Sequence, residues 1–253
     1  MRVLDLTRVI AGPVATRALA QLGAEVLRLD PPARPEIEAQ HLDTGAGKRS
    51  ALLDLADRAG RERFLELLET ADVVVLGYRP AALERLGLSP NELAARRPGL
   101  VVAQLSAWGF DGDDAERRGF DSIVQAACGI AWVEADADAG GARPGALPVQ
   151  ALDHASGYLL AAAVLSELDA EANGPSLVRA SLRRTAAELL AGSRRPERTG
   201  AVLGEEARLA QCETRDTPLG RVRIVRPAVT VEGVAADWPA APRPWGRDPA
   251  AWA

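Results

Sequence analysis

The sequence contains 253 residues, of which 47% are hydrophobic and 26% are charged, and its net charge is −5. Such a length permits one large domain with a sizeable core, and the composition is typical of a soluble globular protein. The acidic balance argues against nucleic acid as a partner, because proteins that bind it usually carry a concentrated basic face. No apolar run reaches the roughly 20 residues that a membrane helix needs, so no membrane partner is expected.

Cysteine and histidine usage narrows the class further. The two cysteines, Cys128 and Cys212, are too few for a disulfide framework. No basic segment followed by an apolar stretch and a cleavage site is found, so no signal peptide is expected. These features predict a cytoplasmic protein. The two histidines and two distant cysteines show no metal-ligand spacing, so the sequence predicts no metal site.

In the first hundred residues, short apolar runs alternate with helical stretches. The patterns predict strands at 2–6, 25–29, 50–55, 73–76 and 100–105, and helices at 14–22, at 61–69 and from Ser89 onward. Ser89 is followed by proline at the first helical position and by glutamate at the third, which is a capping-box signature. The apolar run 73–76 is typical of a strand covered on both faces. The alternation predicts an α/β fold with a Rossmann-like open parallel sheet flanked by helices.

The second half has a different composition. We expect a flexible surface loop at 134–148, helices at 154–168 and 178–190, a polar linker at 192–200 and a strand at 222–225. The tail from Asp237 holds three Trp and four Pro in 17 residues, and we expect it to lie on the surface with its rings tucked in. The chain is therefore divided into a large domain at 1–190 and a linker plus C-terminal segment at 191–253 that packs back on it.

The segment Thr7–Pro13 lies between the first strand and the first helix. Ligands of open α/β sheets bind outside the carboxyl ends of the strands. Gly12 would let the backbone approach a ligand, and Pro13 would begin a helix whose amino end attracts anions. An ordinary strand-to-helix turn explains the same residues. Gly45–Ser50 is not a phosphate loop, because its glycine spacing is wrong and it opens onto a strand.

Arginines follow the strand at 73–76. Gly77-Tyr78-Arg79-Pro80 and then Arg85 could clamp a phosphate through paired guanidinium hydrogen bonds. The alternative is that both arginines are solvated at the start of a helix.

Asp153 opens the apolar helix, where a helix N-cap is the simpler interpretation of an aspartate. The alternative is a carboxylate nucleophile, with Gly157 one turn later leaving room for a substrate. Both roles are compatible, because a carboxylate held by helix amides stays ionised. His154 is adjacent in sequence, but neighbours on a helix point about 100° apart and need not form a pair.

Several short blocks follow one another in a characteristic order. They are Val3–Pro13, Leu22–Leu27, Gly47–Ser50 with Leu53–Leu55, Ala71–Val75, Tyr78–Pro80 with Leu83–Gly87, Pro98–Val101, Trp108-Gly109, Arg118–Asp121, Gln125–Ala127 with Gly129, and Asp153 with Gly157. Their order along the chain resembles that of the family III (CaiB/BaiF-type) coenzyme A transferases. The similarity covers roughly residues 2–190, with a shorter similar stretch at 217–226.

The resemblance implies a reaction. Asp153 would attack the thioester of an acyl-CoA and form a mixed anhydride, and the released CoA thiolate would convert it to an aspartyl-CoA thioester. A small carboxylic acid would then complete the exchange. This is covalent catalysis, which divides one difficult transfer into easier steps. Acyl-CoA and a carboxylate are the implied substrates, and no metal is implied.

The resemblance also implies roles for other residues. Tyr78 and Arg85 would hold the nucleotide part of CoA, and Arg118 would meet a phosphate. Phe120 and Asp121 would border the catalytic carboxylate, together with Gly157. The full set implied for the CoA-binding side is Arg8, Ile10, Ala11, Gly12, Tyr78, Arg79, Arg85 and Arg118.

Two departures from the family pattern modify this expectation. Only about 30 residues separate the helix ending near Leu190 from the late strand, with no Gly-Gly-Gly run, so we expect a short form without most of the lid domain. Without a lid, water could hydrolyse the anhydride, and a homodimer or a longer homologue could supply the cover. A catalytically weak CoA-binding subunit and a hydrolase are alternatives. Racemisation is disfavoured, because Gly119-Phe120-Asp121 replaces the racemase Gly-His-Asp and His154 would have to serve as the base.

Overall fold

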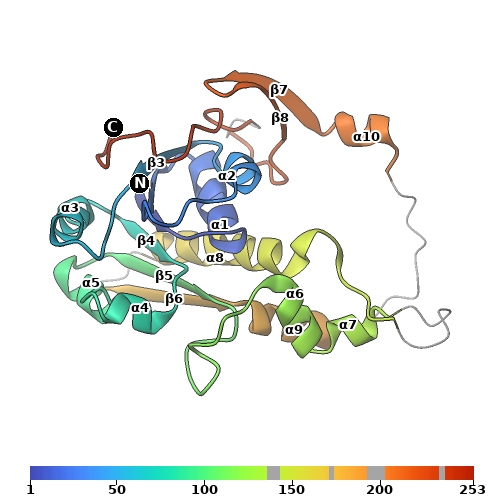
Figure 1. The fold of residues 1–253 in the computed structure, drawn as a ribbon, viewed down its shortest axis with the longest axis horizontal. Helices are drawn as coiled ribbons and strands as arrows, with labels where there is room; N and C mark the ends of the chain where they lie inside the picture. Colours follow the sequence, from blue (N-terminus) through green and yellow to red (C-terminus); the bar gives the residue numbers. More distant parts are fainter. Residues whose placement is uncertain (136–142, 171–173, 193–202, 234–236) are drawn as a thin grey trace.

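The computed structural model describes residues 1–135, 143–170, 174–192, 203–233 and 237–253. Six parallel strands form one sheet in the order β3-β2-β1-β4-β5-β6 (Figure 1). They are β1 Arg2–Leu6, β2 Glu25–Asp30, β3 Lys48–Leu52, β4 Val73–Leu76, β5 Val101–Ser106 and β6 Ser176–Ser181. This is the doubly wound Rossmann order, in which the chain reverses its direction of winding between β1 and β4. The predicted fold class is confirmed.

Helices connect the strands and cover both faces of the sheet. They are α1 Ala11–Gln21, α2 Glu38–Thr44, α3 Arg58–Leu68, α4 Pro80–Glu84, α5 Pro90–Arg96, α6 Asp121–Ala127, α7 Ile130–Val133, α8 Ala151–Asp169, α9 Leu182–Ala191 and α10 Glu205–Leu209, with a 3₁₀ turn η1 at Pro148–Gln150. Helix α1 ends just before Gly23, which has φ +95° as a terminating glycine should. The predicted capping box between Ser89 and Glu92 is present at α5. No helix in the described part of the chain is long and apolar enough to cross a membrane.

Alternate strand residues face opposite layers, which is why the central strands are apolar throughout. On one face, Val73, Val75 and their neighbours pack against α1 and α8. On the other face, Val74 and Leu76 pack against α3, α4 and α5. A third cluster around Trp108 joins α6, α7 and α9 beyond the carboxyl end of β5.

The prediction of a helix at 178–190 is wrong for residues 178–181 and correct from Leu182 onward. Residues Ser176–Ser181 form strand β6, which pairs with β5 from Val101↔Ser176 to Ser106↔Ser181, and α9 begins only at Leu182. Leu177, Val178 and Ala180 are consistent with either structure locally. The open edge of β5 decides between them, since pairing there satisfies the backbone groups of both segments.

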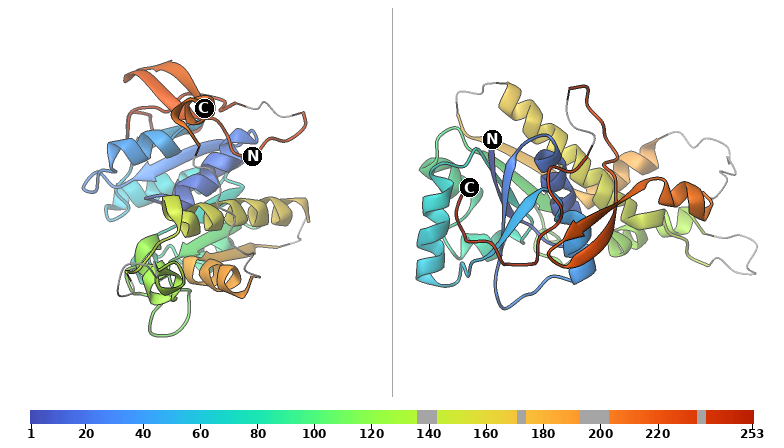
Figure 2. Two further views of the ribbon diagram at one scale, coloured as in Figure 1. Left: turned by 90° about the vertical axis from the view of Figure 1, so that its right-hand side faces the viewer. Right: turned by 90° about the horizontal axis from the view of Figure 1, so that it is seen from above.

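Residues 237–253, here called the C-terminal strap, run along the β3 side of the sheet (Figure 2). The Ser50 N–H donates to the Asp248 carboxylate at 2.8 Å, and Ala51 forms a bridge with Arg247. The predicted tucking of the rings is confirmed. Each indole N–H has an acceptor: Trp238 donates to the Val225 carbonyl at 2.9 Å, Trp245 to the Asp30 carboxylate at 2.9 Å and Trp252 to the Leu67 carbonyl at 3.2 Å.

Before the strap, β7 Cys212–Thr217 and β8 Gly220–Val225 form an antiparallel hairpin, so the predicted late strand exists and has a partner that the sequence did not reveal. The predicted loop at 134–148 falls partly outside the described residues, at 136–142, and the linker predicted at 192–200 falls outside them except for Gly192.

Candidate active site

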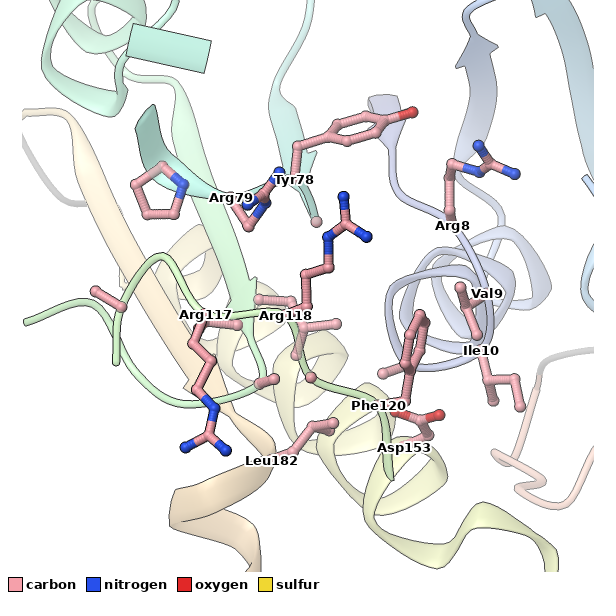
Figure 3. Close-up of a pocket in the computed structure, with 18 of the residues that line it drawn as sticks. Arg8, Val9, Ile10, Tyr78, Arg79, Arg117, Arg118, Phe120, Asp153 and Leu182 are labelled. Carbon is pink, nitrogen blue, oxygen red and sulfur yellow. The ribbon is translucent and has the colours of Figure 1, made fainter. Parts of the chain in front are cut away.

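A cavity of about 420 Å³ opens at the carboxyl ends of β1, β4 and β5 (Figure 3). Its walls are the turn after β1, the turn after β4, and the loop between β5 and α6, with one residue each from α8 and α9. This is the point at which the strand order reverses, where open α/β sheets bind their ligands.

Eight of the predicted site residues line this cavity and therefore lie together although they come from four segments of the chain. They are Arg8, Ile10, Ala11, Tyr78, Arg79, Arg118, Phe120 and Asp153. Gly12, Arg85, Asp121 and Gly157 do not line it. Arg85 ends the short helix α4, and the other three lie behind the cavity wall.

Asp153 is the only acid among the described residues that line the cavity. Helix α8 begins at Ala151, with Gln150 in the N-cap position, so the prediction of Asp153 as N-cap is wrong. Only 7% of the residue is exposed. Burial, and secondly the negative charge of Asp121, raise the pKa of Asp153 to about 7. The expectation that helix amides keep this carboxylate ionised is also wrong, because none of the causes acting on it lowers its pKa.

Asp121, only 1% exposed, lies directly behind Asp153. One carboxylate oxygen accepts the Asp153 N–H at 3.0 Å, and the other accepts the side-chain amide of Gln125. The Gln125 carbonyl oxygen in turn accepts the Leu147 N–H at 2.8 Å. This chain of hydrogen bonds fixes the start of α8 against α6 and keeps a second negative charge close to Asp153.

Two predicted glycines determine the packing behind the cavity. A Cβ on Gly157 would lie 2.5 Å from the Ala11 carbonyl and 2.9 Å from Cγ1 of Val14, so glycine is what lets α8 approach α1 this closely. A Cβ on Gly12 would lie 2.4 Å from the Cβ of Thr7, so the space beside Gly12 is taken by the Thr7 side chain, just after β1, and not by the cavity. The amino end of α1 is therefore held close to the first turn of α8.

The arginines around the cavity differ in their partners. Arg117 stacks over the Trp108 ring, 4.9 Å from its centroid, and lies 3.5 Å from the Asp114 carboxylate. Arg79 donates to the Glu116 carbonyl at 3.3 Å. The Arg118 guanidinium has no acceptor among the described residues. Figure 3 shows Arg118 extending toward Tyr78 and Arg79 while Arg117 points away from them, so Arg118 is free to meet an anion.

Sequence reasoning missed Arg34, which also lines the cavity and has no side-chain acceptor among the described residues. It follows the Pro31-Pro32 turn just after β2. Since β2 is adjacent to β1 in the doubly wound Rossmann order, the predicted Rossmann-like fold would have allowed a cation after β2 to be placed near Arg8. His154 does not line the cavity, and burial, together with the charge of Arg17, lowers its pKa.

A cluster of paired charges lies behind the β1 side of the cavity. The Asp5 carboxylate accepts hydrogen bonds from Lys48 Nζ at 3.1 Å and Thr16 Oγ1 at 2.6 Å. Although burial alone would raise it, the charges of Lys48 and Arg28 lower the pKa of Asp5. Burial lowers the pKa of Lys48 to about 8. Burial raises the pKa of the Tyr78 hydroxyl, which has no hydrogen-bond partner among the described residues.

Among the described residues, no group of three His, Cys, Asp or Glu side chains could hold a metal ion. Within the described ranges, the site instead combines one carboxylate that has no cation partner with guanidinium groups that have no acceptor, at the switch point of a doubly wound sheet. These features define an α/β protein with a buried carboxyl group of raised pKa beside several arginines at one cavity.

Residues 1–201 match the pattern described as CoA-transferase family III, and the chain belongs to this family. It is 37% identical over 180 residues to the probable fatty acyl-CoA transferase Rv3272 of Mycobacterium tuberculosis, covering 66% of this chain and 45% of that protein. It is 28% identical over 238 residues to the succinyl-CoA:glutarate CoA-transferase of Mus musculus, covering 85% and 54%.

Solved structures agree with this assignment. The crystal structure of Rv3272 superposes with a TM-score of 0.68 at 34% identity, over 76% of this chain and 56% of that one. A CAIB/BAIF family protein from Brucella suis superposes with a TM-score of 0.66 at 25% identity, over 87% and 64%. The chain thus spans about half the length of the relatives it matches.

Proposed function

We propose that this protein transfers coenzyme A between an acyl-CoA thioester and a small carboxylic acid, with Asp153 as the covalent nucleophile. The observation that carries the proposal is the position of Asp153 as the one acid among the described residues of an arginine-bordered cavity. Membership of CoA-transferase family III supports the reaction class, and the names of the relatives support acyl-CoA as the donor.

The exchange proceeds in balanced steps. A carboxylate oxygen of Asp153 attacks the thioester carbonyl, and the carbon–sulfur bond breaks to give a mixed anhydride and CoA thiolate. The thiolate attacks the aspartyl carbonyl, which releases the donor acid as a carboxylate and leaves an aspartyl-CoA thioester. The acceptor carboxylate then displaces CoA thiolate to form a new anhydride, and the thiolate attacks the acceptor acyl carbon, which regenerates Asp153.

The two ends of the cavity suit the two parts of an acyl-CoA. Arg118 and Arg34 have no side-chain acceptor in the part of the chain that the structure describes, so their guanidinium groups can bind phosphate oxygens, with Arg8, Tyr78 and Arg79 nearby. Around Asp153 the lining is apolar, with Ile10, Phe120 and Leu182. Such a lining holds the acyl group and keeps the carboxylate poorly solvated, which makes it a stronger base and nucleophile once it is ionised.

Within this proposal, residues 1–190 supply the nucleophile and the CoA-binding cavity, and residues 191–253 return to the sheet. Excluding water from the anhydride requires a cover over the cavity. We propose that a second copy of the chain or a longer homologue supplies it. Light scattering at micromolar concentration tests this, and a mass that corresponds to one chain, alone and with the homologue, would count against it.

Intact-protein mass spectrometry tests the covalent step. The protein is mixed with a panel of acyl-CoAs of increasing chain length, with and without hydroxylamine, and compared with Asp153→Asn. We expect an adduct on the wild-type protein that hydroxylamine removes, and none on the variant. As a matched control, Asp169→Asn changes an aspartate at the far end of the same helix and should leave the adduct intact.

Two results would contradict the proposal. An adduct that persists in Asp153→Asn would place the nucleophile elsewhere. If the wild-type protein binds CoA but forms no adduct, the chain is a CoA-binding subunit and has no transferase activity on its own.

A further inference from the structure

The turn after β1 contains a strained residue at the edge of the cavity. Val9 has φ +70°, in the left-handed region, although its side chain is β-branched. Such a conformation is a genuine outlier for valine and persists only where surrounding contacts hold it. Val9 lies between Arg8 and Ile10, and all three line the cavity that contains Asp153. The conformation of Val9 therefore sets how the chain enters α1 beside the nucleophile.

One side chain from another segment holds this turn. The Glu36 carboxylate accepts the Val9 N–H at 3.1 Å and lies 3.4 Å from Arg8 Nη2. Arg8 also donates to the Pro35 carbonyl at 2.9 Å. Three hydrogen bonds to the β2–α2 segment thus fix consecutive residues of the β1–α1 turn.

Glu36 is itself held rigidly and in its charged form. Only 3% of its side chain is exposed, and its carboxylate pairs at 2.8 Å with Arg28, whose side chain is 1% exposed. Arg28 pairs in turn with Asp30 at 2.7 Å. Although burial alone would raise it, the Val9 N–H bond and the charge of Arg28 lower the pKa of Glu36. An ionised, immobile acceptor is what a strained amide needs to stay in place.

We propose that Glu36 is a positioning residue, which holds Val9 in its left-handed conformation and so fixes the amino end of α1 beside Asp153. This role rests on the proposed function of Asp153, since it concerns the geometry in which that carboxylate reacts. Glu36 touches neither Asp153 nor the cavity and acts through Val9. A simpler role, in which Glu36 only neutralises Arg28, makes different predictions for the variants below.

The first test compares Glu36→Ala with Glu36→Gln in the adduct assay. Both variants remove the charge that faces Arg28, but the Gln carbonyl can still accept the Val9 N–H. We expect Glu36→Ala to slow adduct formation at saturating acyl-CoA by about 10- to 100-fold, the loss that small misplacements at a reacting centre cause. The acyl-CoA concentration for half-maximal rate should not rise, since a negative charge near Arg8 is lost. Glu36→Gln should recover most of the rate.

A rescue experiment isolates the Val9 contact. Glycine adopts positive φ readily, so a glycine at position 9 does not need Glu36 to hold it there. We expect the factor by which Glu36→Ala slows adduct formation to be about tenfold smaller in a Val9→Gly background than in the wild-type background. Glu38→Ala, two residues away on the exposed side of the same segment, is the matched control and should show no such coupling. The proposal would be overturned if Glu36→Ala and Glu36→Gln slowed adduct formation equally and Val9→Gly did not rescue the rate. Glu36 would then serve only as the counter-ion of Arg28.

Hydrogen exchange gives a readout that does not depend on turnover. The Val9 amide should exchange at least about tenfold faster in Glu36→Ala than in the wild-type protein, while the amides of β1 and β4 stay unchanged. Unchanged protection of the Val9 amide would overturn the positioning role even if activity fell. If the wild-type protein forms no aspartyl adduct, the proposed function fails, and the exchange experiment still decides the role of Glu36.

Discussion

Two carboxylates buried on either side of the cavity have opposite electrostatic surroundings. Asp5, at the end of β1, is fully buried, and its pKa is lowered because Lys48 and Arg28 offset the effect of burial. Asp153, in the first turn of α8, is almost as buried, and its pKa is raised to about 7 by burial and by the charge of Asp121. The difference comes from the neighbours, because one carboxylate faces two cations and the other faces an anion.

The charges around Asp5 stabilise the fold, whereas Asp153 is the carboxylate that we propose to react. On the paired side, Lys48 pairs with Asp5, and Arg28 pairs with Asp30 and Glu36, so these ion pairs link β3 to β1 and connect β2 with the segment that follows it. Asp153 has no cation partner among the residues that the structure describes, which agrees with the nucleophilic role that we propose for it. A buried carboxylate that is left unpaired destabilises the fold, and its persistence beside a cavity is typical of a reactive group.

The largest expected effect comes from breaking the buried ion pair between Lys48 and Asp5. Lys48→Met leaves Asp5 buried without its nearest cation and should lower the free energy of unfolding by about 3–5 kcal/mol, as for other broken buried pairs. Urea denaturation at pH 7 measures this. Adding Asp5→Asn to the same chain should restore most of the loss, and a double variant as unstable as the single one would contradict the pairing.

Replacing Asp153, in contrast, should raise the free energy of unfolding above pH 7. Asp153 binds a proton more tightly in the folded protein than in the unfolded chain, so the wild-type protein loses stability as the pH rises from about 4 through about 7. Asp153→Asn stays neutral and should be more stable above pH 7 by up to roughly 4 kcal/mol, from a shift of about three pKa units at 1.36 kcal/mol each. Thermal melting at pH 5 and pH 8 measures it. An equal difference at both pH values would contradict this origin.

A smaller effect should follow from removing the anion behind Asp153. In the wild-type protein, adduct formation should rise with pH around a midpoint near 7, because the attacking carboxylate must be ionised. Asp121→Asn removes the charge but not the burial, so the midpoint should fall by roughly one unit or less. Asp114→Asn, an acid of the β5–α6 loop that lies outside the cavity lining, is the control. An unchanged midpoint in Asp121→Asn would assign the whole shift to burial.

The arginines also differ in whether a carboxylate pairs with them, and removing one of them should have a smaller effect. Arg28 is buried between two carboxylates, whereas Arg34 and Arg118 line the cavity without acceptors in the described part of the chain. Arg118→Gln and Arg34→Gln should each weaken CoA binding by about 3- to 10-fold, comparable with losing one charge-assisted hydrogen bond. Calorimetry with CoA at two salt concentrations measures this. Arg96→Gln, on α5, should bind like the wild-type protein.

The sequence predicts the parts of this molecule that depend on local patterns. The strands at 2–6, 73–76 and 100–105 and the capping box at Ser89 reflect apolar runs and end signals that neighbouring residues supply. Strand β6 could not be predicted in this way, because a short, half-exposed segment becomes a strand only when the edge of β5 is available.

The candidate site shows the same division. Tyr78, Arg79 and Asp153 could be selected because each follows a strand or opens a helix in family order. The link between Asp121 and Asp153 spans 32 residues and depends on how α6 packs on α8, so neither the hydrogen bond nor the raised pKa of Asp153 could be predicted. Glu36 was missed for the same reason, since its partner Val9 lies 27 residues earlier.

The C-terminal strap has a consequence for the order of events on the ribosome. Ser50 on the outer strand β3 meets Asp248, which is 198 residues later, and Asp30 meets Trp245, which is 215 residues later. At about 5–20 residues per second, translation leaves that edge of the sheet uncovered for roughly 10 to 40 seconds. An uncovered edge strand can pair with other nascent chains. The yield of folded protein should therefore depend on how many copies are being made at once and on how soon residues 237–253 emerge.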